Sequence, residues 1–99
     1  MKILALEKEV CGVTDAQFTE EILKAEARRA WELHQSGVLR ELYFSADKQE
    51  AVLVLECDNA GEARRQLAEL PLVRAGLIDF QVIPLAAYSG FERLFAPTP

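Results

Sequence analysis

The sequence predicts an α+β domain of the ferredoxin-like class, in which two helices cover one face of a four-stranded antiparallel sheet. Three observations lead to this class. Strand-like and helix-like segments follow one another in the order βαββαβ. Each helical segment starts at a capping signal and ends at a glycine or a proline. The chain has 99 residues, which suits one domain, so we expect residues 1–99 to form it, with residues 88–99 as a C-terminal tail.

The first half of the chain supplies a strand, a long helix and a second strand. Residues 3–8 are apolar and then charged, which is typical of a short strand. Thr14 and Gln17 have the spacing of a capping box, so the long helix is expected to start there. It is expected to end at Gly37, because glycine readily adopts the left-handed turn that follows a helix. Residues 38–45 form the second predicted strand.

The second half repeats the pattern after a polar turn. Residues 51–57 are the most apolar predicted strand. Asn59 and Glu62 again fit a capping box, which predicts a shorter helix. Pro71 is expected to stop that helix, because proline has no N–H to donate and clashes with the preceding turn. Residues 78–85 then return as the last strand.

The two strands predicted at the centre of the sheet are apolar on both faces. In the first strand, Ile3 and Ala5 point to one face and Leu4 and Leu6 to the other, so both faces are apolar. The third strand shows the same pattern, with Leu53 and Leu55 on one face and Val52 and Val54 on the other. The helices cover one face only, and soluble monomers rarely expose a wide apolar patch. We therefore expect a homodimer, or a larger ring of dimers, built by packing two sheets face to face. The alternative is a monomer whose tail folds over the open face.

Charge and composition argue against several classes of partner. The net charge is −5 and the acids are scattered, so neither nucleic acid nor an anionic membrane surface is an expected partner. No apolar run approaches the ~20 residues of a membrane span. The N-terminal MKILALEKEV lacks the cleavage site of a signal peptide, and a cytoplasmic protein is therefore expected.

Metal and cofactor motifs are absent from the sequence. Cys11 and Cys57 stand apart from each other and from the single histidine, His34, so no metal site is expected and both thiols should be free. The glycines are isolated, so no phosphate-binding loop is expected.

A set of residues in both halves of the chain matches the pattern of a known family: Glu26, Glu32, Leu33, Ser36, Gly37, Arg40 and Leu42, then Leu70-Pro71-Leu72, Asp79, Val82 and Pro84-Leu85-Ala86. Through them the chain resembles the muconolactone delta-isomerase family of the dimeric α/β barrel superfamily. The resemblance implies a homodimer that needs no cofactor. It also implies isomerisation, by a proton shift, of a small unsaturated lactone that carries a carboxylate.

Glu26 is the candidate catalytic residue. It lies four residues after Ile22 and four before Ala30, within the apolar stripe of the long helix. A partly desolvated carboxylate has a raised pKa, which suits a base that works near neutral pH. The alternative is a position at the edge of the stripe, paired with Arg29 or Arg40.

Three residues are candidate substrate contacts. Arg40 is expected to share a strand face with Leu42 and Phe44, where its charge needs an anionic ligand or an internal salt bridge. Tyr43 points to the opposite face, which suits a dimer interface as well as a ligand. Asp79 begins the last strand, where it could orient Arg40 or cap the preceding loop.

Different classes of function remain open. In the enzyme hypothesis, Glu26 carries the proton and Arg40 holds the carboxylate of the substrate or steadies enolate charge. In the alternative, the protein is a non-catalytic dimeric module that binds a small apolar or aromatic ligand, or only a partner protein. A haem-degrading or oxygenase-like relative of the superfamily is a third hypothesis, with His34 as its one histidine.

Overall fold

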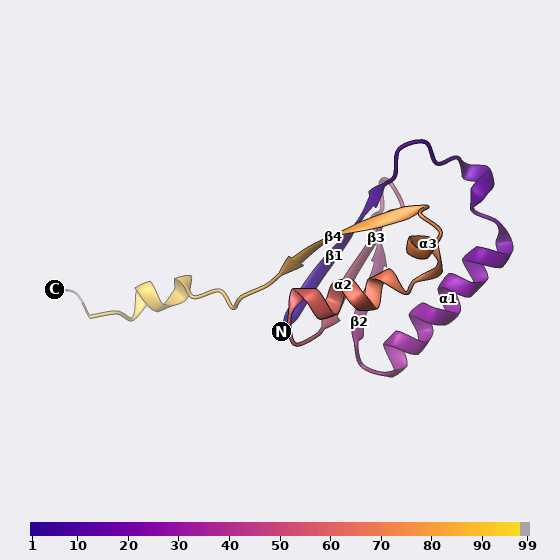
Figure 1. Ribbon diagram of the computed structural model, residues 1–99. Coiled ribbons are helices and arrows are strands. Elements are labelled where there is room, and N and C mark those ends of the chain that lie inside the picture. Colours follow the sequence, from indigo (N-terminus) through magenta and orange to yellow (C-terminus); the bar gives the residue numbers. More distant parts are fainter. Residues whose placement is uncertain (98–99) are drawn as a thin grey trace.

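Strands β1 (Lys2–Glu9) and β3 (Ala51–Glu56) lie at the centre of a four-stranded antiparallel sheet, with β2 (Leu39–Phe44) and β4 (Ile78–Pro84) at its edges (Figure 1). The computed structural model describes residues 1–97. The strand order β2-β3-β1-β4 confirms the predicted ferredoxin-like fold.

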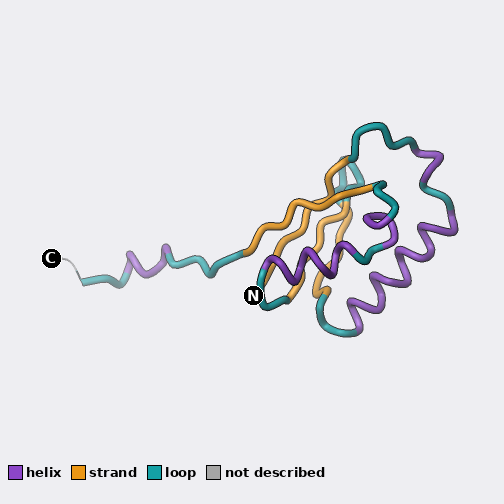
Figure 2. Tube along the Cα trace, in the orientation of Figure 1, coloured by secondary structure: helices purple, strands orange, loops and turns teal. Residues whose placement is uncertain are grey.

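The helices lie together on one side of this sheet (Figure 2). They are α1 (Glu20–Gln35), α2 (Ala60–Ala68) and the single-turn α3 (Pro71–Arg74), and two short 3₁₀ helices complete the elements, η1 (Asp15–Gln17) and η2 (Gly90–Leu94). Within the described part of the chain, no helix combines the length and the apolar character needed to span a membrane.

The start of the long helix differs from the prediction. The capping box of Thr14 and Gln17 is present, but it caps the 3₁₀ turn η1. The backbone then leaves the helical region at Phe18, and Thr19 makes a second cap by accepting the Ile22 N–H at 3.3 Å. The expectation of one continuous helix from Thr14 was therefore wrong. Its end was predicted correctly, because Gly37 has a φ of 85° in the turn after α1.

The role of Pro71 also differs from the prediction. The Asn59 side chain accepts the Glu62 N–H at 2.8 Å and caps α2 as expected. However, α2 ends at Ala68, before the proline is reached. Pro71 instead begins α3 at the first helical position, where its missing N–H costs nothing and its φ is already helical.

The hydrophobic core lies between the sheet and the helices. Across the β1–β3 ladder Ile3 faces Leu55 and Ala5 faces Leu53, so alternate residues point to the helices. Burial of each of the three large side chains, Ile3, Leu53 and Leu55, contributes about 1.5–3 kcal/mol. The buried set includes, besides these three and Ala5, Leu33, Leu39, Ala63, Leu67, Leu70, Leu72, Leu77, Ile78 and Phe80.

The opposite face of the sheet carries a row of half-buried aliphatic side chains: Leu4, Leu6, Val52, Val54 and Ile83. The C-terminal tail does not fold over them, because it extends away from the domain (Figure 1) and leaves its aromatic side chains exposed. The described chain therefore does not adopt the alternative in which its own tail covers the face, and the homodimer stays a prediction.

Candidate functional site

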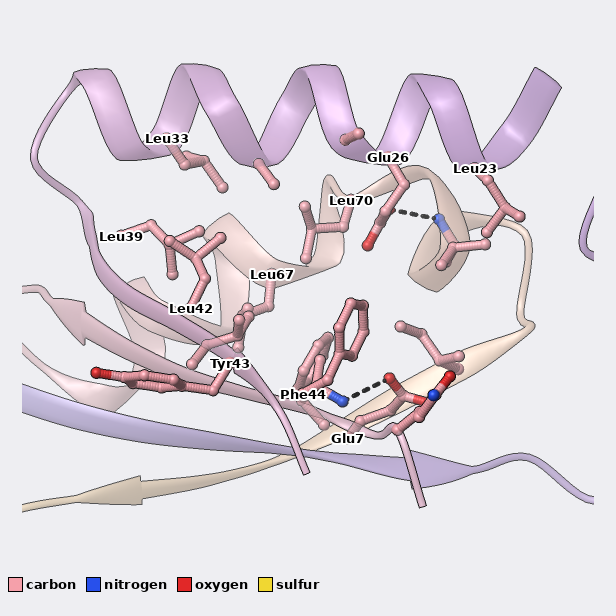
Figure 3. Close-up of a pocket in the computed structure, with 18 of the residues that line it drawn as sticks. Glu7, Leu23, Glu26, Leu33, Leu39, Leu42, Tyr43, Phe44, Leu67 and Leu70 are labelled. Carbon is pink, nitrogen blue, oxygen red and sulfur yellow. Dashed lines mark hydrogen bonds between the residues drawn. The ribbon is translucent and has the colours of Figure 1, made fainter. Parts of the chain in front are cut away.

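A cavity of about 520 Å³ opens between α1 and the helix-facing side of the sheet (Figure 3). Its volume falls in the range of roughly 300–1,000 Å³ that small-molecule sites occupy. The apolar lining is Phe18, Leu23, Ala27, Ala30, Leu33, Leu39, Leu42, Phe44, Ala51, Leu53, Leu55, Leu67, Leu70, Leu72, Ile78 and Phe80. The polar lining is Glu7, Glu26, Tyr43 and Gln49.

Glu26 points from α1 toward the sheet and into this cavity (Figure 3). Its Oε1 accepts the backbone N–H of Leu72 at 3.0 Å. Burial raises the pKa of Glu26 above its ordinary value, the hydrogen bond from Leu72 opposes the rise, and the nearby charge of Glu7 adds to it. The result is a half-buried carboxyl group with a raised pKa on the wall of an apolar cavity.

The predicted alternative for Glu26, an ion pair with Arg29 or Arg40, is not what the structure has. Arg29 instead binds Glu69 at 3.0 Å, at the end of α2, and Glu32 at 3.8 Å. Among the described residues Glu26 forms no ion pair, and its polar partner is the backbone of α3. A backbone N–H has no net charge, so it lowers the pKa of a carboxyl group less than an arginine does.

Glu7 is a cavity residue that the sequence reasoning missed. It follows Ile3 and Ala5 on alternate positions of β1, so it shares their helix-facing side. Its Oε1 accepts the N–H of Ala51 at 3.0 Å (Figure 3). The alternation of β1 is the signal that points Glu7 toward the helices, whereas a charged residue at the end of a strand is more typical of a solvent-exposed edge.

Arg40 lies outside the cavity. The pairing of β2 with β3 shifts between Leu39 and Glu41, so a bulge interrupts the strict alternation there. The Arg40 side chain is exposed and donates to the carbonyl oxygen of Gly37. It therefore does not join Leu42 in the cavity lining, contrary to the expected shared face.

The other two predicted contacts differ in position. Tyr43 lines the edge of the cavity, and its hydroxyl donates to Glu41 Oε1 at 2.8 Å on the same strand. Asp79 lies outside the cavity, with its carboxylate 3.9 Å from Lys8 Nζ. The structure thus brings Glu26 and Tyr43 to one cavity and leaves Arg40 and Asp79 outside it.

The remaining candidates for chemistry are structural or isolated. His34 Nδ1 lies 2.9 Å from the carbonyl oxygen of Leu39 and ties the end of α1 to β2. Both thiols are free, as predicted, with Cys11 exposed and Cys57 buried. No group of three or more metal-ligating side chains occurs in residues 1–97.

Comparison with known proteins gives a family match and two similar folds. Residues 4–90 match the family model described as muconolactone delta-isomerase. The protein in a crystal structure of muconolactone isomerase is 21% identical in sequence to this chain, and the two structures superpose with a TM-score of 0.71. The match covers 90% of this chain and 92% of the isomerase chain.

The second fold is the 5-chloro-2-hydroxyhydroquinone dehydrochlorinase of Burkholderia phenoliruptrix AC1100, solved in complex with 2,5-dihydroxybenzoquinone. It shares 16% identity with a TM-score of 0.65, covering 91% of this chain and 98% of that one. No curated protein sequence is significantly similar to this chain. At these identities the two structures establish a shared fold.

Proposed function

This chain belongs to the muconolactone delta-isomerase family, and we propose that it catalyses a cofactor-independent proton shift on a small unsaturated ring compound. The family match confirms the resemblance carried by the sequence motifs. The observation that carries the proposal is Glu26, a half-buried carboxyl group with a raised pKa that points into the apolar cavity. Such a group is suited to exchange a proton near neutral pH.

The proposed reaction uses Glu26 twice. As a base, Glu26 takes a proton from the carbon next to the conjugated system, and the electron pair of the C–H bond moves into that system. As an acid, it then returns the proton to another carbon of the same system. The Leu72 N–H holds Oε1, which leaves Oε2 to carry the proton. General acid–base catalysis of this kind contributes roughly 10²–10⁴ in rate.

The other predicted substrate contacts stay predictions. Tyr43 borders the cavity, but its pairing with Val52 and its hydrogen bond to Glu41 turn its ring toward the open face of the sheet. A role at a dimer interface therefore stays open beside a substrate contact. For Arg40 to bind a substrate carboxylate in this cavity, its exposed side chain would have to turn into a cavity that it does not line. Asp79 would act only through other residues, because it lies outside the cavity.

A non-catalytic ligand-binding module is the second candidate. It is favoured by apolar side chains that line the cavity and yet remain exposed: Leu23, Leu42 and Phe44. Such side chains would be covered by a ligand or by a second subunit. This candidate retains the cavity but has no need of an ionisable Glu26.

An ultraviolet assay with Glu26→Gln tests the proposal. Muconolactone and its methyl ester are offered separately to the wild type, to Glu26→Gln and to Glu21→Gln, an exposed acid on the same helix. Turnover that falls by roughly 10²–10⁴ in Glu26→Gln alone would support the proton carrier. Folded wild-type protein that turns over neither compound would favour the binding module.

A further inference from the structure

The cavity holds two carboxyl groups that come from opposite walls. Glu26 reaches in from α1, and Glu7 reaches in from β1 on the sheet (Figure 3). The two lie close enough for the charge of Glu7 to raise the pKa of Glu26. The site therefore has a carboxyl group on both sides of the space in which a ligand binds.

No cation balances these acids within the cavity. Among the residues that the structure describes, its lining contains no lysine, arginine or histidine. Lys8 on β1 and Lys24 and Arg28 on α1 are exposed and do not line the cavity. Arg29 pairs with Glu69, and Arg40 donates to the carbonyl oxygen of Gly37. A ligand carboxylate would thus enter an apolar space beside two acids without an opposite charge to pair with.

Each acid is held in place by one oxygen. Leu72 N–H donates to Glu26 Oε1 at 3.0 Å, and Ala51 N–H donates to Glu7 Oε1 at 3.0 Å. The second oxygen of each carboxyl group makes no hydrogen bond to another described residue and is available to a ligand. A hydroxyl group on a bound ring is the natural partner for an anchored carboxylate, because it donates a hydrogen bond without adding charge.

We propose that this cavity binds an unsaturated ring that carries a hydroxyl donor and no negative charge, and that Glu7 both accepts that donor and rejects anionic ligands. The inference rests on the proposed function in that it concerns the same cavity. It departs from a carboxylated lactone as the preferred ligand. The apolar walls bind the ring, Glu26 faces its conjugated system, and Glu7 selects by charge.

Three ring compounds of the same size test the proposal by calorimetric titration at neutral pH. The probes are 4-hydroxybenzyl alcohol, 4-hydroxybenzoate and 4-hydroxybenzylamine, which are neutral, anionic and cationic. The wild type should bind the alcohol at least about tenfold more tightly than the benzoate, because like charges placed together are strongly unfavourable. Tighter binding of the benzoate than of the alcohol or of the amine would overturn the proposal, and this ranking needs no variant.

Glu7→Gln tests the role of the residue itself. The amide keeps an oxygen to accept the Ala51 N–H and removes the charge, so the fold should be retained, as a thermal melt will check. In this variant the affinity for the benzoate should rise and the affinity for the alcohol should fall. The gap, which is the ratio of the two affinities, should therefore narrow. Glu9→Gln makes the same change of charge at an exposed position of β1 and should leave the gap unchanged. An unchanged gap in Glu7→Gln would remove Glu7 from the selection.

The binding test and the activity test fail independently. If the neutral probe is preferred but no proton shift is found, the inference about the ligand stands and the isomerase activity is overturned. If turnover depends on Glu26 but the anionic probe binds best, the activity stands and the inference is overturned.

Discussion

Glu26 of α1 and Leu72 of α3 are joined by a hydrogen bond of 3.0 Å, from the backbone nitrogen of Leu72 to the carboxyl oxygen Oε1 of Glu26. Pro71, which has no N–H, occupies the first position of α3, so Leu72 supplies the first N–H of that helix. The start of α3 thus holds the end of the Glu26 side chain, whose backbone belongs to α1. One oxygen is fixed and the other remains free in the cavity.

Stability should depend on pH through Glu26. Its pKa is raised from the ordinary value of 4.5, mainly by burial, so the folded state binds this proton more readily than the unfolded state. The stabilisation is complete below the unfolded pKa and is lost as the pH rises through the folded pKa. The free energy of unfolding of the wild type should therefore fall relative to that of Glu26→Gln between pH 4.5 and neutral pH. Urea unfolding of both proteins across this range measures the difference, and parallel curves would contradict it.

The Leu72 N–H should be sensitive to the loss of its acceptor. Glu26→Gln retains a side-chain oxygen for this N–H, whereas Glu26→Ala leaves it without a protein partner. An unsatisfied buried donor costs about 1–3 kcal/mol, so the alanine variant should be less stable than the glutamine variant by about that amount. Chemical denaturation at one pH compares the two variants directly. Equal stability would mean that water replaces the carboxyl oxygen at no cost.

Two leucines should respond very differently to truncation. Leu55 is fully buried between β3 and the helices, and its replacement by alanine should destabilise the domain by about 2–5 kcal/mol. Leu94 is exposed in the tail, and the same replacement should change the stability by no more than about 0.5 kcal/mol. Thermal unfolding of the two variants measures both effects. A large effect at Leu94 would show that the tail packs against the folded domain in solution.

The open face of the sheet should be an interface between two copies. Its aliphatic row includes Val54, and a charge placed there would be desolvated when two sheets pack together. Multi-angle light scattering should give a mass of twice 11.1 kDa for the wild type and of 11.1 kDa for Val54→Glu. Lys48→Glu, in an exposed turn, serves as the control and should stay dimeric. A wild-type mass of 11.1 kDa would overturn the predicted homodimer.

Local signals in the sequence were enough for the fold but not for every side chain of the site. The apolar runs and the glycine after α1 located the sheet and the long helix, and helical spacing identified Glu26 as a residue of the apolar stripe. Arg40 was misplaced because a bulge depends on pairing with the neighbouring strand, which the local alternation of β2 does not reveal. Glu7 was missed because a charged residue at the end of a strand usually faces water, whereas here Ala51 N–H holds it over the cavity.

The extended tail alters how the molecule moves through solvent. The radius of gyration is 16.8 Å, whereas a compact domain of this length has about 13 Å. The longest dimension is 63 Å against 28 and 22 Å for the other two. A particle of this shape experiences more friction than a sphere of equal mass, so a single copy should elute early from a sizing column and sediment slowly. Removal of residues 88–99 should bring the frictional ratio down toward that of a compact domain.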